Sequence, residues 1–167
     1  MNKTIKKGFA LLLLWGSMNG FSQENQSSNT ELQKAQLQLV SGYKDYNPQA
    51  AFVTITKWAS QGNADAMNSL GLIYSRGLGA DINESLALDW FTKAALNGNS
   101  KAHYNLGLLF KNGVGVAKDL PRAFECFKKA AEQGYDEAYY EWGIMQKRGL
   151  GTEQDETMAF NIFKEGA

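Results

Sequence analysis

The feature that most constrains this chain is an internal repeat of 36 residues. The stretch 64–98 reappears without gaps at 100–134, and most of it returns at 136–167. Glycine recurs in all three copies in the columns that begin at Gly71, Gly77 and Gly79. With glycine at about 7% of residues, a match at both shifts has a chance probability of roughly 0.5% per column. Such a period indicates stacked supersecondary units and therefore decides the fold before any other cue.

Each copy is predicted to fold as a helix, a turn and a second helix. In the first copy, small or apolar residues stand at positions 66, 67, 70, 71, 73 and 74, which is the spacing of one helix face. This predicts a helix over 64–76, with Asn63 as its N-cap and Gly77 just past its end. Gly79 allows a tight connection. The second helix follows a good N-cap residue in every copy: Asn83, Asp119 and Asp155.

Small and large side chains alternate in the predicted packing layer. Gly71 and Ala66 would let a neighbouring helix approach closely, while Leu70 fills the space between. The second helix is expected to bury five residues: Ala87, Leu88, Phe91, Ala94 and Ala95. One hairpin cannot bury its own apolar face, so hairpins must stack. The sequence predicts an all-α fold, a right-handed α-α solenoid of about three 36-residue helix-turn-helix repeats plus an N-terminal capping helix.

The repeated motif resembles the Sel1-like repeat, a relative of the tetratricopeptide repeat. It combines a Leu-Gly pair, an aromatic residue three positions later, a Gly-x-Gly turn and a Lys-Ala-Ala run. The resemblance covers about residues 47–167. It departs from the motif at Gln146, which replaces the aromatic residue, and at Gly166, which replaces an alanine.

The repeat phase divides the chain into six segments. They are a signal peptide (1–22), a disordered leader (23–29), a capping helix with a degenerate half repeat (30–62), and three repeats (63–98, 99–134 and 135–167). The last repeat stops three residues before its closing glycine column. Two interpretations stay open: the chain is a piece of a longer array, or a partner covers the last face.

Residues 1–22 have the pattern of a secretory signal. Lys3, Lys6 and Lys7 precede a short apolar run at 9–15, and 20–22 is a small-x-small cleavage site. The apolar run is far shorter than the roughly 20 residues of a membrane-spanning helix. We therefore expect an exported protein, periplasmic or secreted, without stable membrane insertion after cleavage. An uncleaved N-terminal anchor is the alternative.

A capping helix is predicted to follow the polar leader. Residues 28–31 have the pattern of a capping box. Four residues would then share one helical face: Leu32, Ala35, Leu39 and Tyr43. Asn47 and Pro48 open the next helix as N-cap and first helical residue, so 47–62 is the second half of a degenerate opening repeat.

The sequence offers little for catalysis, and no cofactor or metal is expected. Cys126 is the only cysteine and falls mid-helix, so we expect a buried apolar filler, not an activated thiol. His103 is the only histidine, which we expect at a surface or half-buried helix position. The Gly-x-Gly turns recur as helix connectors, whereas a phosphate loop would be singular and follow a strand.

The charge balance is mild. Loss of the signal peptide removes three lysines from 17 Lys+Arg and none of the 17 acids, which leaves a net charge near −3. This value predicts no general affinity for nucleic acid or for anionic membranes.

The resemblance implies a partner-binding surface on the first helices. In tetratricopeptide arrays the first helix of each repeat lines the concave face, and four columns tend to face the groove. The corresponding residues, called here the first-helix strip, are Asn68, Leu72, Ser75, Arg76, Tyr104, Leu108, Lys111, Asn112, Tyr140, Ile144, Lys147 and Arg148. Tyr and Arg are favoured at binding hot spots. The alternative is that these charges are merely solvated.

Two function classes follow. The first is a non-enzymatic interaction module, an adaptor or scaffold of the cell envelope or its exterior, that binds a partner protein or peptide on its concave face. Sel1-like proteins act as adaptors, which the resemblance implies. The second is a cell-wall-related hydrolase of the Cys-rich Sel1-like type linked to β-lactamase activity. The absence of Cys pairs from this chain disfavours it.

Overall fold

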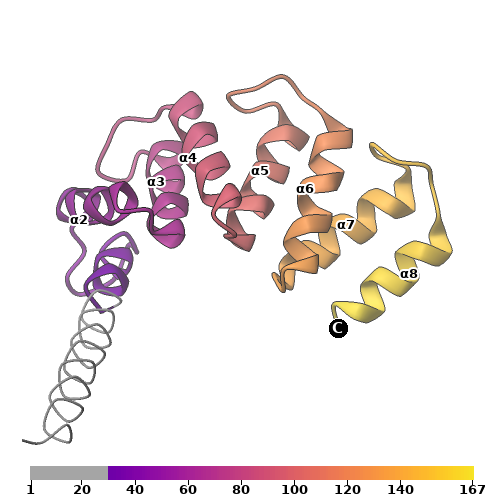
Figure 1. The fold of residues 1–167 in the computed structure, drawn as a ribbon, viewed down its shortest axis with the longest axis horizontal. Helices are drawn as coiled ribbons and strands as arrows, with labels where there is room; N and C mark the ends of the chain where they lie inside the picture. Colours follow the sequence, from indigo (N-terminus) through magenta and orange to yellow (C-terminus); the bar gives the residue numbers. More distant parts are fainter. Residues whose placement is uncertain (1–29) are drawn as a thin grey trace, which may run out of the picture.

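The computed structural model describes residues 30–167, so the predicted signal peptide, the leader and the first half of the predicted capping box lie outside the described residues. All regular secondary structure in this part of the chain is helical. A short N-terminal helix, residues 30–37, precedes seven longer ones: α2 (Pro48–Ser60), α3 (Ala64–Arg76), α4 (Glu84–Leu96), α5 (Ser100–Asn112), α6 (Leu120–Glu132), α7 (Glu137–Arg148) and α8 (Glu156–Glu165). The helices follow one another in an arch (Figure 1). The predicted all-α repeat solenoid is confirmed.

The ends of α3 lie where the sequence predicts them. The Asn63 side chain accepts a hydrogen bond from the backbone N–H of Ala66, at 2.9 Å, and so caps α3. Gly77 ends the same helix with φ 70°, a left-handed conformation that favours glycine. The third copy departs from this pattern. Tyr135 occupies the cap column there, and the N-cap of α7, Asp136, makes no side-chain cap hydrogen bond.

One hydrogen bond closes the turn of every repeat. The backbone N–H of the second helix's N-cap donates to the carbonyl of the aromatic column: Asn83 to Tyr74 at 2.8 Å, Asp119 to Phe110 at 2.9 Å and Asp155 to Gln146 at 3.1 Å. Gln146, which replaces the aromatic residue, is only 4% exposed. Its Nε2 donates to the carbonyl of Glu153 at 2.9 Å, so the polar side chain is satisfied within the turn.

The helix glycines make room for phenylalanine rings. A Cβ added to Gly71 would lie 2.5 Å from the ring of Phe91, and one added to Gly107 would lie 2.7 Å from the ring of Phe127. Gly143 has the same relation to Phe163. The predicted close approach is confirmed, and the approaching group is the aromatic side chain of the second helix in the same hairpin.

The second glycine of each turn joins neighbouring repeats. A Cβ on Gly115 would lie 2.7 Å from the backbone oxygen of Glu84, in the first turn of α4. Gly79 lies in the same way against Pro48, and Gly151 against Leu120. The loop of one repeat thus rests on the start of the preceding second helix. This contact gives a second reason for glycine at positions 79, 115 and 151, where the sequence alone indicates only a tight turn.

The N-terminal helix is shorter than predicted. Leu32 and Ala35 are buried, as expected, but the helix ends at residue 37. Leu39 and Tyr43 lie in the following turns and are half-buried, so the predicted single helical face is wrong beyond residue 37. The reason is the reversal that leads into α2, in which Gly42 has φ 92° and the Asn47 N–H donates back to the Gln38 carbonyl at 3.1 Å.

Asn99 links two repeats as well as capping a helix. Its Oδ1 accepts from the Ala102 N–H at 2.9 Å, and its Nδ2 donates to Asp65 Oδ1 at 2.7 Å. We expect Asn99→Ala to lower the free energy of unfolding by about 2 kcal/mol, because both bonds are lost at a buried position. Asn83→Ala, which removes an exposed cap alone, should cost about 1 kcal/mol. Urea unfolding followed by circular dichroism measures both, and equal losses would contradict a cross-repeat role for Asn99.

Candidate functional site

Polar contacts run across the first helices α3, α5 and α7. Asn105 Nδ2 donates to Asn68 Oδ1 at 2.9 Å, which joins α5 to α3. Lys111 Nζ lies 2.6 Å from Glu141 Oε2, which joins α5 to α7. Two members of the first-helix strip, Asn68 and Lys111, are therefore engaged with a neighbouring repeat. The sequence signal that could have indicated this ion pair is the pair of opposite charges 30 positions apart on consecutive first helices.

The two tyrosines of the strip have different surroundings. Tyr104 packs edge-on against Phe127, with ring centroids 5.5 Å apart, and against Tyr135 at 5.1 Å. Burial, followed by the nearby carboxylates of Glu141 and Glu137, raises the pKa of Tyr104. Tyr140 is 64% exposed. Tyr104 thus contributes mainly to repeat packing, whereas Tyr140 presents aromatic area to solvent.

The remaining strip residues differ in how far they are exposed to solvent. The hydroxyl of Ser75 donates to the Leu72 carbonyl at 3.1 Å. Leu108 and Ile144 are half-buried. The exposed members stand at the carboxyl ends of the first helices: Arg76, Asn112, Lys147 and Arg148. These side chains are the accessible polar part of the strip.

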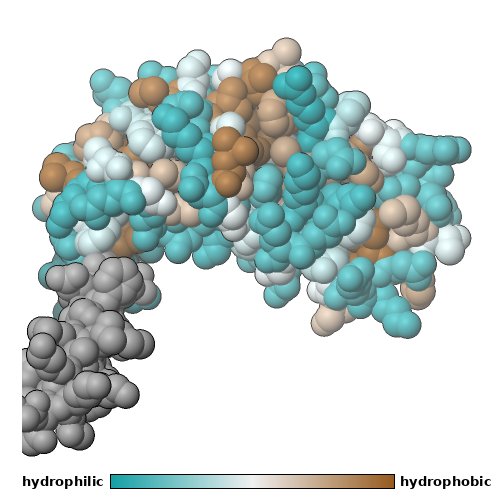
Figure 2. Space-filling view, viewed as in Figure 1, coloured by the Kyte–Doolittle hydropathy of each residue, from teal (hydrophilic) through white to brown (hydrophobic). Residues whose placement is uncertain are grey.

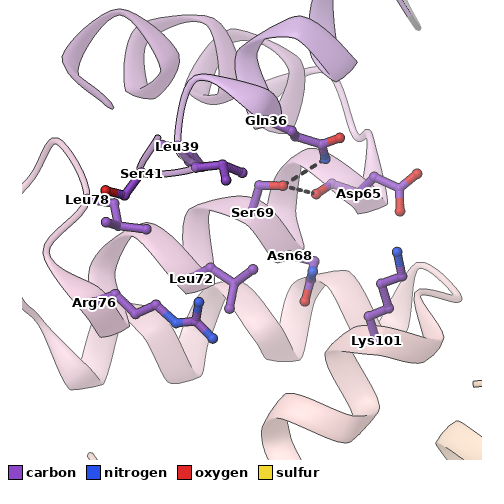
Figure 3. Close-up of a pocket in the computed structure, with 11 residues that line it drawn as sticks. Gln36, Leu39, Ser41, Asp65, Asn68, Ser69, Leu72, Arg76, Leu78 and Lys101 are labelled. Atoms are coloured by element: carbon purple, nitrogen blue, oxygen red, sulfur yellow. Dashed lines mark hydrogen bonds between the residues drawn. The ribbon is translucent and has the colours of Figure 1, made fainter. Parts of the chain in front are cut away.

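A hollow of about 620 Å³ lies between the N-terminal segment and α3. It brings together three strip residues, Asn68, Leu72 and Arg76, as the close-up in Figure 3 shows. The other lining residues come from the N-terminal segment, α3, the turn after α3 and the start of α5: Gln36, Leu39, Val40, Ser41, Asp65, Ser69, Leu78 and Lys101. Comparison of repeat columns could not find Gln36, Leu39, Val40 and Ser41, because the N-terminal segment is not a copy of the repeat.

Hydrogen bonds hold the inner wall of the hollow in place. Gln36 Nε2 donates to Ser69 Oγ at 2.9 Å, and Ser69 in turn donates to the Asp65 carbonyl at 2.8 Å (Figure 3). The first bond ties the N-terminal helix to α3 next to the hollow, and the second lies within α3. The apolar part of the lining includes Leu39 and Leu72. The hollow is thus a supported, partly apolar site.

The charges at the hollow are unbalanced. The Asp65 carboxylate accepts a hydrogen bond from Asn99, so part of its hydrogen-bonding capacity is already used. The ion pairs found within residues 30–167 involve neither Arg76 nor Lys101. Both cations are exposed and face a site with one carboxylate. An anionic ligand would therefore meet charge complementarity there.

Most of the face seen in Figure 2 is hydrophilic, with hydrophobic side chains gathered mainly over α4 and α5.

Among residues 30–167, no helix combines the length and the apolar character needed to cross a bilayer. The same part of the chain holds no group of three His, Cys, Asp or Glu side chains placed to hold a metal ion.

Burial favours the neutral forms of the Cys126 and His103 side chains. Burial raises the pKa of the Cys126 thiol to about 11, and the residue is half-buried, less so than the predicted buried filler. Burial and then the Lys129 charge lower the pKa of the half-buried His103. Neither group is activated as a nucleophile or as a charged acid.

The Cys126 thiol should react slowly in the folded protein. Near pH 8, a pKa of about 11 leaves far less thiolate than the ordinary value does, so modification by a thiol-specific disulfide should be about a hundredfold slower than in urea. Stopped-flow absorbance of the released chromophore measures both rates. Comparable rates in native and unfolded protein would contradict the burial of this side chain.

The helical hairpins can now be compared with known proteins. The sequence model of the Sel1 repeat matches residues 64–99, 100–135 and 136–167. The chain belongs to the Sel1 repeat family. Sel1 repeats are generally protein-interaction modules and non-catalytic scaffolds. No curated protein matches this chain.

Solved structures of Sel1 repeat proteins share the fold. A Sel1 repeat protein from Oxalobacter formigenes has a TM-score of 0.72 and 29% identity, over 85% of this chain and 58% of its own. The protective antigen c5321 of uropathogenic Escherichia coli, described as having an SLR fold, has a TM-score of 0.75 and 26% identity, over 86% and 31%. This Sel1 repeat chain therefore spans less than two thirds of either relative.

The cysteine rich protein B of Helicobacter pylori is more distant from these Sel1 repeats. Its TM-score is 0.58 at 22% identity, over 76% of this chain and 91% of its own. At that identity the likeness concerns the fold alone.

Proposed function

We propose that this Sel1 repeat protein is a non-enzymatic adaptor or scaffold that binds a partner protein or peptide on the face formed by its first helices. That face is the concave one in the related arrays. The observation that carries the proposal is the hollow beside α3, where Asn68, Leu72 and Arg76 of the first-helix strip lie together. Concave sites with apolar walls and a few polar groups are the usual places for ligand binding.

The proposed location is outside the cytoplasm, either periplasmic or secreted. The pattern of residues 1–22 supports export. The neutral, half-buried thiol of Cys126 supports a binding role over one in covalent catalysis. No nucleic-acid partner and no cofactor are part of the proposal.

Affinity capture tests the proposed function. The immobilised protein is exposed to envelope extract of its own organism beside a variant in which exposed strip residues are changed: Arg76→Ala, Tyr140→Ala and Arg148→Ala. A matched control changes exposed residues outside the strip: Lys34→Ala, Phe160→Ala and Lys164→Ala. Circular dichroism checks that all three proteins are helical.

The expected result is a partner that the wild type and the control retain and that the strip variant loses at least about tenfold, as the loss of several hot-spot contacts would produce. Equal retention by the strip variant and the control would contradict the proposed binding face.

A further inference from the structure

We propose that the hollow beside α3 binds an extended acidic peptide segment whose two carboxylates lie four or five residues apart, with an aliphatic side chain between them. This inference rests on the proposed function and specifies the chemistry of the partner. It follows from three properties of the site: two cations that form no ion pair within residues 30–167, their separation in the direction of the α3 axis, and the apolar lining between them.

The separation of the cations follows from how α5 lies beside α3. The contact between Asn99 and Asp65 places the start of α5 beside the start of α3, so Lys101 stands at that end. Arg76 lies at the far end of α3. With 1.5 Å of rise per residue, the helix between Asp65 and Arg76 spans about 16 Å. Arg76 and Lys101 therefore flank the hollow at opposite ends, as Figure 3 shows.

An extended peptide fits this separation. At about 3.3 Å per residue, 16 Å corresponds to roughly five residues of an extended peptide. Because the side chains of the cations and of the peptide's acids are long, a separation of four residues between the two acids also suffices. A helical peptide would advance only about 7 Å over the same five residues and could not reach both cations. The geometry thus selects an extended ligand with acids at both ends.

The floor between the cations suits one aliphatic side chain and a peptide backbone. Leu39, Leu72 and Leu78 supply apolar contact area. Asn68 is 6% exposed and accepts from Asn105 through Oδ1, which leaves its amide Nδ2 as a donor for a peptide carbonyl. Arginine pairs with carboxylates in a bidentate way, which favours an acid at the Arg76 end.

The test is a titration of the full chain with capped pentapeptides, followed by NMR or calorimetry at about 0.15 M salt. The probe is Glu-Ser-Leu-Ser-Glu. A peptide of the same composition, Ser-Glu-Leu-Glu-Ser, brings the acids two residues apart. Two further peptides replace both glutamates by glutamine or the leucine by serine.

The protein variants are R76Q/K101Q and the matched control K34Q/K164Q, which loses the same charge from exposed positions outside the hollow. We expect R76Q/K101Q to bind the probe about tenfold more weakly and the control to bind it within about twofold. The wild type should bind the rearranged peptide at least about threefold more weakly than the probe, and the glutamine peptide more weakly still.

Several results would overturn the inference: no binding of the probe, equal binding of the rearranged or glutamine peptide, or equal losses in both protein variants. Competition separates this inference from the proposed function. Suppose that affinity capture retains a strip-dependent partner, but the probe peptide neither binds the protein nor displaces that partner. The acidic-peptide inference then fails, while the proposed function stands. If no strip-dependent partner is captured and the probe does not bind, both fail.

Discussion

Gly107→Ala should lower the free energy of unfolding by about 2 kcal/mol, although alanine is the better helix former. The change gains about 1 kcal/mol of helix propensity. Against this, the new methyl group would lie 2.7 Å from Cε1 of Phe127, and the three nearest atoms all belong to that ring. Phe127 is fully buried, so its ring has no room to move away. Overpacking of this kind costs about 1–3 kcal/mol and sometimes more.

A double-mutant cycle isolates the contact between Gly107 and Phe127. In a Phe127→Leu background the ring is gone, so Gly107→Ala should cost at least about 1 kcal/mol less than in the wild type. Urea unfolding followed by far-UV circular dichroism gives all four free energies. If Gly107→Ala stabilises the protein, or costs the same in both backgrounds, the packing reason for this glycine column is wrong.

Gly115→Ala should be more damaging, with an expected loss of about 3 kcal/mol. Two costs add at this position. Gly115 has φ 68°, and a residue with a Cβ loses roughly 1–2 kcal/mol there. The Cβ would also lie 2.7 Å from the backbone oxygen of Glu84, which cannot rotate away as a side chain can. The turn must therefore lift off the preceding second helix.

Gly98→Ala is the matched control for this change. Gly98 has φ 82°, but a Cβ there would meet nothing within 4 Å, so only the backbone cost applies. The difference between the two variants, about 1–2 kcal/mol, measures the contact between neighbouring repeats. Thermal unfolding should also broaden for Gly115→Ala alone, because weaker coupling between repeats reduces cooperativity. Equal losses in the two variants would show that turn geometry alone accounts for this column.

Much of the fold could be predicted because the same helix-turn-helix motif occurs three times in the sequence. Helical spacing, cap residues and glycines recur in register, so the bounds of α3 and its copies follow from local chemistry. The contact between Gly115 and Glu84 could not be predicted in this way. A glycine needed for a left-handed turn and one needed for close approach look the same in sequence. Gly79, Gly115 and Gly151 serve both purposes, because each has a positive φ and lies against the backbone of the preceding second helix.

The candidate site could be predicted only in part. The strip was derived from repeat columns, and columns cannot show which side chains a neighbouring repeat engages, as for Lys111 with Glu141. They also cannot place a segment that is not a copy of the repeat. The reversal after residue 37 forms one wall of the hollow, and its path depends on tertiary contacts such as that of Gln36 with Ser69. Lys101 was missed because its column counterparts, Asp65 and Glu137, are acids.

The most direct test of the proposed binding face is site-specific photo-crosslinking in the protein's own organism. A benzophenone amino acid replaces Val40, which is 54% exposed and lines the hollow, or Val53, which is 69% exposed on α2 and does not line it. The proposed function predicts a crosslinked partner band from position 40 that is absent or much weaker from position 53. Equal bands from both positions, or a band from position 53 alone, would contradict the assignment of the first-helix face and its hollow as the site of partner binding.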